Sequence, residues 1–210
     1  MAEKFENQPE EKQQQILNAA FQEFGEHGYH KASTNRIVEA AGIGKGMLFY
    51  YFKSKKKLFD YVLSYAFQII EGYTEQIDMS IPDVIARYEE ASRIKMKTYL
   101  QHTEIFHFFG NLLLNFQEDL PEEWQKKIGD LQIEMKKRMF SGIDYSLFRK
   151  DIDPETALKL IFWSIEGFER ELLAQLRGVN FEETPLDPIW DSFFHYLEAL
   201  RKAYYEERGH

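Results

Sequence analysis

The sequence predicts an all-α protein of about nine helices. Apolar residues recur every three or four positions along nearly the whole chain, and runs of alternating apolar and polar residues, typical of strands, are absent. Glycine and proline, which interrupt helices, number only 12 and 6 among 210 residues. A short helix, a glycine turn and a second short helix near the start indicate a small N-terminal unit, followed by a larger helical remainder.

The first three predicted helices form this unit. The first runs from about Pro9 to Glu26, and Gly28 ends it. Its apolar face consists of Ile16, Leu17, Ala20, Phe21 and Phe24. Ser33 or Thr34 can cap the second helix, and Ile37, Val38 and Ala41 would face inward from it. After a Gly-Ile-Gly turn at 42–44, the third helix covers about 45–52.

Later helices have clear start signals. Ser54 can cap a helix that continues to about Ile77. Four prolines suit a first helical position, where the missing N–H costs nothing: Pro82, Pro121, Pro154 and Pro188. Asp153 and Asp187 precede two of them as predicted N-caps. These starts complete the count of about nine helices.

Charge is distributed unevenly along the chain. The whole sequence has 26 basic and 35 acidic residues, a net charge of −9. Residues 1–60 carry a net charge of +1, and residues 61–210 carry −10. Between 33 and 57 there are six bases and one acid, Glu39; the bases are Arg36, Lys45, Lys53, Lys55, Lys56 and Lys57. A basic segment on an acidic chain favours a polyanionic partner that meets one face only.

The third helix has two different faces on a helical wheel. Leu48, Phe49 and Phe52 are expected to pack inward, whereas Gly46, Met47 and Tyr50 point outward. A glycine that faces outward has no packing role, but it lets a nucleic-acid surface approach the backbone. Exposed methionine and tyrosine beside lysines suit contact with thymine methyl groups and phosphates.

Three lysines follow the Ser54 cap and therefore lie in the first turn of a helix. Cations there oppose the helix dipole, at a cost of about 0.3–1 kcal/mol each. A phosphate bound at this helix end would reverse the effect, because the free N–H groups and the ammonium groups would both bind it. The alternative is a solvated lysine patch on an ordinary three-helix unit.

Residues 10–70 resemble the DNA-binding domain of the TetR family of transcriptional regulators. The family pattern has an amphipathic helix ending in phe-x-x-x-gly, a threonine-rich cap, ile-ala-x-x-ala-gly-val-ser, and then gly-x-leu-tyr-x-tyr-phe-x-ser-lys-x-x-leu. This chain reads AAFQEFGEHGYHKASTNRIVEAAGIGKGMLFYYFKSKKKLF in the same register. The resemblance implies a helix-turn-helix DNA-binding domain at 1–60 and a helical regulatory and dimerisation domain at 61–210.

The resemblance also implies roles for individual positions. Ser33 and Thr34 match capping and phosphate-contacting positions, and Arg36 matches a position that contacts phosphate or a nearby base. The major-groove face would consist of Lys45, Gly46, Met47 and Tyr50, and the phosphate-binding positions would include Tyr51 and Lys55. Gly44, Met47 and Phe49 depart from the family pattern, so the operator cannot be borrowed from a relative.

Two apolar stripes near the C-terminus occupy the place where the family builds a four-helix dimer interface. The predicted interface residues are Leu158, Ile161, Phe162, Ile165, Phe168, Leu172, Trp190, Phe193, Phe194 and Leu197. Internal core packing is the alternative for both stripes.

The segment 105–116 is apolar almost all round, as in a buried helix. Its polar residues His107, Asn111 and Asn115 form one stripe that either faces solvent or orients a ligand. Ligand sites are mostly apolar with a few polar groups. The predicted pocket residues are Tyr99, Phe106, His107, Phe109, Asn111, Leu113, Phe116, Trp124 and Trp163.

Other function classes find little support. The chain has no cysteine, no signal peptide and no apolar run of membrane-spanning length, which favours a soluble cytoplasmic protein. Nucleotide loops and zinc-protease motifs are absent, so no enzyme activity, metal or cofactor is predicted.

Together these features predict a homodimeric DNA-binding regulator. It is expected to be a repressor that binds a palindromic operator and is released by a small-molecule effector, an apolar or aromatic compound. Two alternatives remain open: an activator or protein-responsive regulator, and a helical binding or enzyme module that does not act on DNA.

Overall fold

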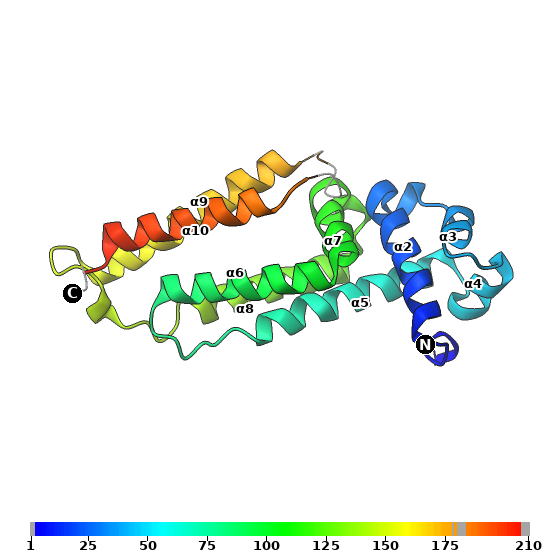
Figure 1. Ribbon diagram of the computed structural model, residues 1–210, viewed down its shortest axis with the longest axis horizontal. Coiled ribbons are helices and arrows are strands. Elements are labelled where there is room, and N and C mark those ends of the chain that lie inside the picture. Colours follow the sequence, from blue (N-terminus) through cyan, green and yellow to red (C-terminus); the bar gives the residue numbers. More distant parts are fainter. Residues whose placement is uncertain (1–2, 178, 180–183, 207–210) are drawn as a thin grey trace. The chain divides into compact units, whose positions relative to one another are not determined.

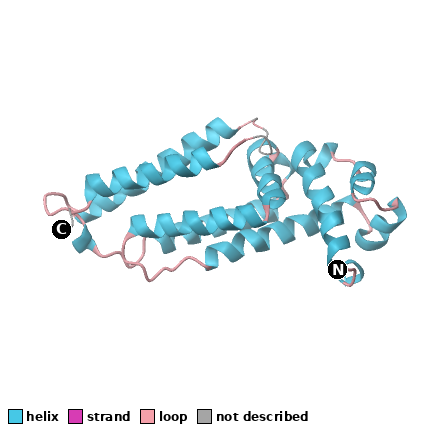
Figure 2. Ribbon diagram, viewed as in Figure 1, coloured by secondary structure: helices cyan, strands magenta, loops and turns pink. Residues whose placement is uncertain are grey.

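The computed structural model describes residues 3–177, 179 and 184–206 and confirms the all-α fold class (Figure 1). Figure 2 shows helices joined by short loops, without a strand among the described residues. The α-helices are α1 Glu3–Glu6, α2 Glu10–Lys31, α3 Thr34–Ala40, α4 Lys45–Phe52, α5 Lys55–Glu75, α6 Val84–Gln101, α7 Thr103–Asn115, α8 Glu122–Met139, α9 Pro154–Leu176 and α10 Asp187–Tyr204. Two 3-10 helices, η1 Gln117–Asp119 and η2 Tyr145–Leu147, complete the described elements. The sequence did not predict α1.

The chain divides into two compact units. The first contains residues 3–72 and 101–124, and the second contains residues 73–100, 125–177 and 184–206. Helix α7 therefore belongs to the same unit as α2, α3 and α4. The predicted functional division between residues 60 and 61 falls inside α5 and stays a prediction.

The core of the first unit forms where α2 packs against α7. The rings of Phe21 and Phe108 lie 5.3 Å apart, and both are almost fully buried. Gly25 lets the two backbones approach, since a Cβ at this position would lie only 3.2 Å from the Cα of Phe108. The predicted apolar stripe of α2 thus faces inward.

Helix α2 is kinked near its end, at Gly28. The sequence predicts that Gly28 ends this helix, but one further turn follows and α2 reaches Lys31. Gly28 has φ +65°, a left-handed conformation that a side chain would strain, and the N–H of Ala32 donates to its carbonyl at 3.2 Å. The kink directs the chain toward Ser33 and the start of α3.

The second unit has its own apolar core, drawn mainly from α6, α9 and α10. Its buried residues are Val84, Ile85, Phe148, Ala157, Ile161, Ile165, Phe193, Leu197, Leu200 and Tyr205. Arg87 of α6 is fully buried beside this core. Its Nη1 donates to the carbonyls of Arg138, Met139 and Ser141 at 3.1, 3.0 and 2.6 Å. Burial lowers the pKa of Arg87, and the carbonyls at the end of α8 stabilise its charge.

Most predicted helix starts agree with the structure to within one or two residues. The Ser54 Oγ accepts from the N–H of Lys57 at 3.2 Å, and the Asp153 carboxylate accepts from that of Thr156 at 2.8 Å, so both are N-caps. At Pro82 the prediction is wrong, because α6 begins at Val84. There the Asp83 carboxylate accepts from the N–H groups of Ile85 and Ala86 and supplies the cap.

Two other starts shift by a single residue, which is a usual uncertainty at helix ends. Helix α8 begins at Glu122, one residue after Pro121, and α10 begins at Asp187, one residue before Pro188. The prediction of Asp187 as an N-cap is therefore wrong, because Leu186 occupies that position and no side chain caps the helix. In the described part of the chain, the structure contains no helix that is both long and apolar enough to cross a bilayer.

Candidate nucleic-acid interface

Helices α3 and α4 are joined by a tight turn around Gly42. Gly42 has φ +62°, and its N–H donates to the carbonyl of Glu39 at 3.1 Å. The N–H of Ile43 donates to the carbonyl of Val38 at 3.0 Å, which closes the end of α3. No atom lies within 4 Å of where a Cβ would be, so the positive φ, rather than a lack of space, favours glycine at residue 42.

The two faces of α4 differ as the helical wheel predicts. Leu48 and Phe52 are buried, with 1% and 4% of their surface exposed, and Phe49 is half-buried. On the opposite side, Tyr50 is 53% exposed and Met47 is 38% exposed. The core contacts of Leu48 and Phe52 hold the helix, so its outer side chains are presented from a rigid support.

The exposed surface of α4 also has room and charge for a polyanion. A Cβ added at Gly46 would meet no atom within 4 Å, which leaves the backbone open there. Lys45 is exposed at the first position of the helix, and no acidic residue occurs in its sequence KGMLFYYF. We call the exposed residues Lys45, Gly46, Met47 and Tyr50 the outer face of α4.

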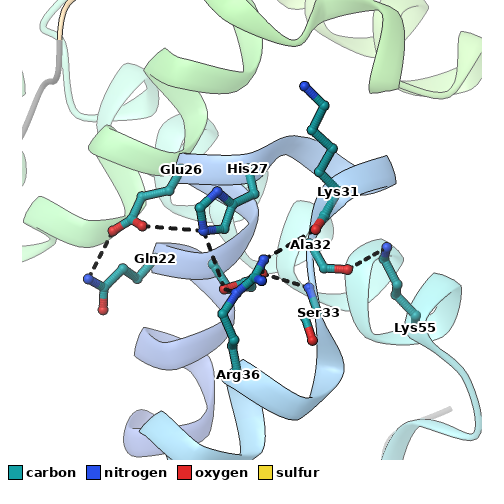
Figure 3. Close-up of polar contacts among 9 residues, drawn as sticks. Gln22, Glu26, His27, Lys31, Ala32, Ser33, Arg36 and Lys55 are labelled. Carbon is teal, nitrogen blue, oxygen red and sulfur yellow. Dashed lines mark hydrogen bonds and ion pairs between the residues drawn. The ribbon is translucent and has the colours of Figure 1, made fainter.

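Arg36 of α3 pairs with a buried acid that the sequence did not single out, although the arginine side chain itself stays 52% exposed. The Glu23 side chain of α2 is only 8% exposed, and its carboxylate accepts from Arg36 Nε at 2.8 Å and from Nη2 at 2.5 Å. The same carboxylate accepts from the N–H of Ser33 at 2.6 Å. Figure 3 shows Arg36 pointing back toward α2 rather than away from it. The predicted contact of Arg36 with DNA stays a prediction, and the geometry favours a supporting role.

Opposing effects determine the protonation of Glu23. Burial alone would raise the pKa of this carboxyl, but hydrogen bonds from Arg36 and from the Ser33 N–H outweigh burial and hold the pKa below its ordinary value. Nearby, the His27 Nε2 lies 3.8 Å from the Oε2 atom of Glu23 and 3.6 Å from that of Glu26. The signal for Glu23 was present in the sequence, because it lies seven residues after Ile16 and so shares the apolar face of α2.

Lys55 is also used within the protein. Its Nζ donates to the carbonyls of Ala32 at 2.7 Å and His30 at 3.1 Å, so it binds the end of α2 from the first turn of α5 (Figure 3). Burial lowers the pKa of Lys55, and the charge of Arg36 acts in the same direction, while Asp119 and Glu23 oppose them. A phosphate contact by Lys55 would have to share its ammonium with these carbonyls.

The remaining predicted phosphate-binding positions differ in exposure. Ser33 and Thr34 are half-buried at the start of α3, and no side chain caps that helix by a hydrogen bond. Tyr51 is 5% exposed, and its ring packs against Phe5 of α1 with centroids 5.7 Å apart. The burial of Tyr51 argues against its predicted role as an exposed phosphate ligand, because α1, which the sequence did not predict, covers the ring.

The residues predicted to line a ligand pocket do not share one environment. Phe109, Asn111 and Trp124 are buried, whereas Trp163 is 59% exposed on α9. Tyr99 and Trp163 belong to the second unit, and the other predicted pocket residues belong to the first. His107 and Asn111 line a groove of about 250 Å³ that α7 forms with α2, together with Asn18, Phe21, Gln22, Gly25, Glu26, Glu104 and Phe108.

A second hollow, of about 490 Å³, lies along α9 and has a charged lining, which includes Glu166, Glu169 and Arg170. Glu169 keeps an exposed surface, but the protein atoms packed around its carboxyl raise its pKa, partly opposed by the charge of Lys95. This lining differs from the aromatic pocket that the sequence predicts.

The predicted dimer residues divide into two groups. Ile161, Ile165, Phe193 and Leu197 belong to the core of the second unit, with at most 9% of their surface exposed. The others are partly buried: Leu158, Phe162, Phe168, Leu172, Trp190 and Phe194. The first group therefore fits the core alternative, and only the second group remains available for contact with another chain.

Comparisons with known proteins agree with this geometry. Residues 16–62 match the family model described as bacterial regulatory proteins, tetR family. The HTH-type transcriptional regulator RutR of Escherichia coli (strain K12) is 28% identical over 161 residues, which cover 75% of this chain and 73% of RutR. The HTH-type transcriptional repressor AcnR of Corynebacterium efficiens is 42% identical over 53 residues, 25% of this chain and 28% of AcnR.

A solved structure supports the fold over the whole length. The crystal structure of a TetR family transcriptional regulator from Chloroflexus aurantiacus J-10-FL has a TM-score of 0.65, is 22% identical and covers 98% of both chains. Its likeness concerns the fold, while the match at residues 16–62 concerns the helix-turn-helix itself. The predicted resemblance is thereby confirmed: residues 16–62 match the TetR family model, and the chain is similar over three quarters of its length to a helix-turn-helix transcriptional regulator.

Proposed function

We propose that this regulator is a repressor that binds a palindromic operator in double-stranded DNA as a homodimer. The outer face of α4 carries the proposal, since it presents exposed Lys45, Met47 and Tyr50 around an open Gly46 on a rigid helix. Lysine supplies phosphate binding, and the methionine and tyrosine side chains suit base edges in a major groove. AcnR is named a repressor, which supports the same direction of control here.

In this proposal the predicted DNA-binding residues have two roles. Lys45, Gly46, Met47 and Tyr50 contact DNA, with Ser33 and Thr34 at the neighbouring start of α3. Arg36 and Lys55 hold the corner between α2 and α3, as their contacts with Glu23 and Ala32 indicate. Tyr51 supports α4 from inside.

Selection from a randomised DNA pool at low salt tests the DNA-binding part. We expect an enriched palindrome whose half-sites lie about 34–36 Å apart, or a multiple of that distance. Met47→Ala and Tyr50→Ala should change the selected sequence, because contacts with base edges determine sequence preference. Lys45→Ala should weaken all sequences alike and lower the salt dependence. Lys126→Ala on α8 is the charge-matched control and should leave both properties unchanged. A pool without enrichment would refute the proposal.

The proposed dimer uses the partly buried apolar residues of α9 and α10. A C2 dimer matches the twofold symmetry of a palindromic operator. Light scattering should give twice the 25.0 kDa chain mass at micromolar concentration. Leu172→Glu and Phe194→Glu should shift the mass toward one chain. A monomeric wild-type protein would refute this part.

We also propose that a small apolar or aromatic effector releases the protein from its operator. An effector acts only through different affinities for the bound and free states, so DNA must weaken effector binding by the same factor. A thermal-shift screen of apolar compounds, repeated with operator DNA present, tests both statements. Compounds that stabilise the protein equally with and without DNA would contradict this effector mechanism. We propose a cytoplasmic location, because the operator that this protein would bind lies there.

A further inference from the structure

The short helix α1 is docked on the DNA-binding unit, although it lies outside the segment that matches the family. Its Phe5 is fully buried, and the ring packs against Phe52, Tyr61 and Tyr51 with centroids 4.8, 5.5 and 5.7 Å apart. A four-residue helix is not stable in isolation, so these contacts hold it in place. Phe5 thus fixes α1 against α4 and α5.

Polar contacts support the same position. Burial, followed by the charge of the nearby Glu6 carboxylate, raises the pKa of Tyr61 to about 12. From α2, the Gln13 Nε2 donates to the carbonyls of Glu6 at 3.0 Å and Gln8 at 2.8 Å. Chain ends usually fray unless they are tied down. Here α1 is attached to three different helices of its own unit.

Docking brings a lysine onto the outer face of α4. The Lys4 Nζ lies 4.2 Å from the centroid of the Tyr50 ring, and the Lys53 Nζ lies 5.5 Å from the same centroid. In the described part of the chain, no carboxylate is within ion-pair distance of either ammonium. The Lys53 ammonium also donates to the Tyr50 carbonyl at 3.1 Å. Both lysines thus place positive charge beside the exposed Tyr50 ring, where it would attract a phosphate.

We propose that α1 is a second part of the DNA interface, in which Phe5 seats the helix and Lys4 binds a DNA phosphate beside Tyr50. This inference rests on the proposed function, because it assigns one more contact to the same interface. A phosphate is the matching anion, since the outer face of α4 meets DNA and its edge lies along the backbone of the duplex. Lys4 then adds affinity without sequence preference, and its ammonium also holds the Tyr50 ring in place.

The experiment measures the affinity of the full-length protein for the selected operator over a salt series, by fluorescence anisotropy. Lys4→Gln should make the plot of log affinity against log salt less steep by about 0.9 for each bound protomer. Each lost contact corresponds to roughly eightfold weaker binding at 0.1 M salt. Lys4→Arg keeps the charge and should bind like the wild type. Phe5→Ala should lower the slope by the same amount, because α1 is released.

Controls separate the possible failures. Lys126→Ala should leave the slope unchanged, and deletion of residues 1–8 replaces Phe5→Ala if that variant does not fold. If the wild type shows no salt-dependent DNA binding, the proposed function fails. If Lys45→Ala lowers the slope and Lys4→Gln does not, the inference about α1 fails while the proposed function stands. A weaker Lys4→Gln complex with an unchanged slope also overturns the phosphate contact.

Discussion

The ion pair between Glu23 and Arg36 allows a test of whether Arg36 stabilises the fold or contacts DNA. Glu23→Gln removes the charge of a carboxylate that is only 8% exposed and accepts from both Arg36 and the Ser33 N–H. Hydrogen bonds to a charged group contribute about 1.5–3 kcal/mol each, and glutamine retains only part of this arrangement. We expect the free energy of unfolding to fall by about 1–3 kcal/mol at pH 7.

The pH dependence of this loss has a definite sign. The pKa of Glu23 is lowered in the folded state, so its stabilising effect is fully present above the unfolded-state value of about 4.3. The effect disappears as the pH falls through the lowered folded-state pKa. Urea unfolding should therefore show a difference between wild type and Glu23→Gln that shrinks in acid. Glu26→Gln, an exposed acid of the same helix, should cost less than about 0.5 kcal/mol.

Operator binding supplies the second measurement. If Arg36 supports the corner between α2 and α3, then Arg36→Ala and Glu23→Gln weaken binding similarly and leave the salt slope unchanged. The double variant should be no weaker than either single variant, because both remove the same interaction. The reasoning is refuted if Arg36→Ala lowers the slope by about 0.9 per protomer while Glu23→Gln leaves it unchanged, because Arg36 would then bind phosphate directly.

Three further predictions concern stability, and urea unfolding measures each. Gly28→Ala should lower the free energy of unfolding by about 1–2 kcal/mol more than Gly42→Ala. Both residues have positive φ, but only a Cβ at residue 28 would collide with neighbours, namely Phe116 and η1. Arg87→Met should lower the free energy of unfolding by about 3–5 kcal/mol, because the carbonyls of Met139 and Ser141 lose the guanidinium donor. Arg93→Met should change it by less than about 1 kcal/mol, because the Arg93 side chain is exposed. Asp83→Asn should lower the free energy of unfolding by about 3 kcal/mol at pH 7. This difference should begin to shrink below pH ~4 and disappear as the pH falls through the lowered folded-state pKa of Asp83.

The faces of α4 were predictable because one helical period places Leu48 and Phe52 together and Tyr50 opposite. The lengths of the other long helices followed from the same periodicity and from caps such as Ser54. Helix α1 was not predictable in this way, since four residues are shorter than any window in which a period can be recognised. Its single apolar residue, Phe5, gains meaning only from the rings around it.

The partners of charged residues were beyond the sequence for a different reason. Arg36 and Glu23 are 13 residues apart, and they meet only because Gly28 bends the chain back between them. Likewise, the apolar stripe on α9 would show the same helical periodicity whether it packed inside its own chain or against a second chain. Ile161 and Ile165 belong to the core because α10 supplies Phe193 and Leu197 opposite them. Periodicity predicts a buried face, but the neighbour that buries it follows from tertiary packing.

The basic segment therefore contains two kinds of cation. Arg36 and Lys55 neutralise or bind groups of the protein itself, the Glu23 carboxylate and the carbonyls that end α2. Lys45 remains exposed on the outer face of α4, and Lys4 and Lys53 surround its tyrosine. Because Arg36 and Lys55 already bind groups of the protein, they should release few counterions when DNA binds, and the salt dependence of binding should report mainly the other lysines of the interface. The same division explains how a chain with a net charge of −9 would orient toward DNA, because Lys4, Lys45 and Lys53 lie beside the helix that presents Met47 and Tyr50.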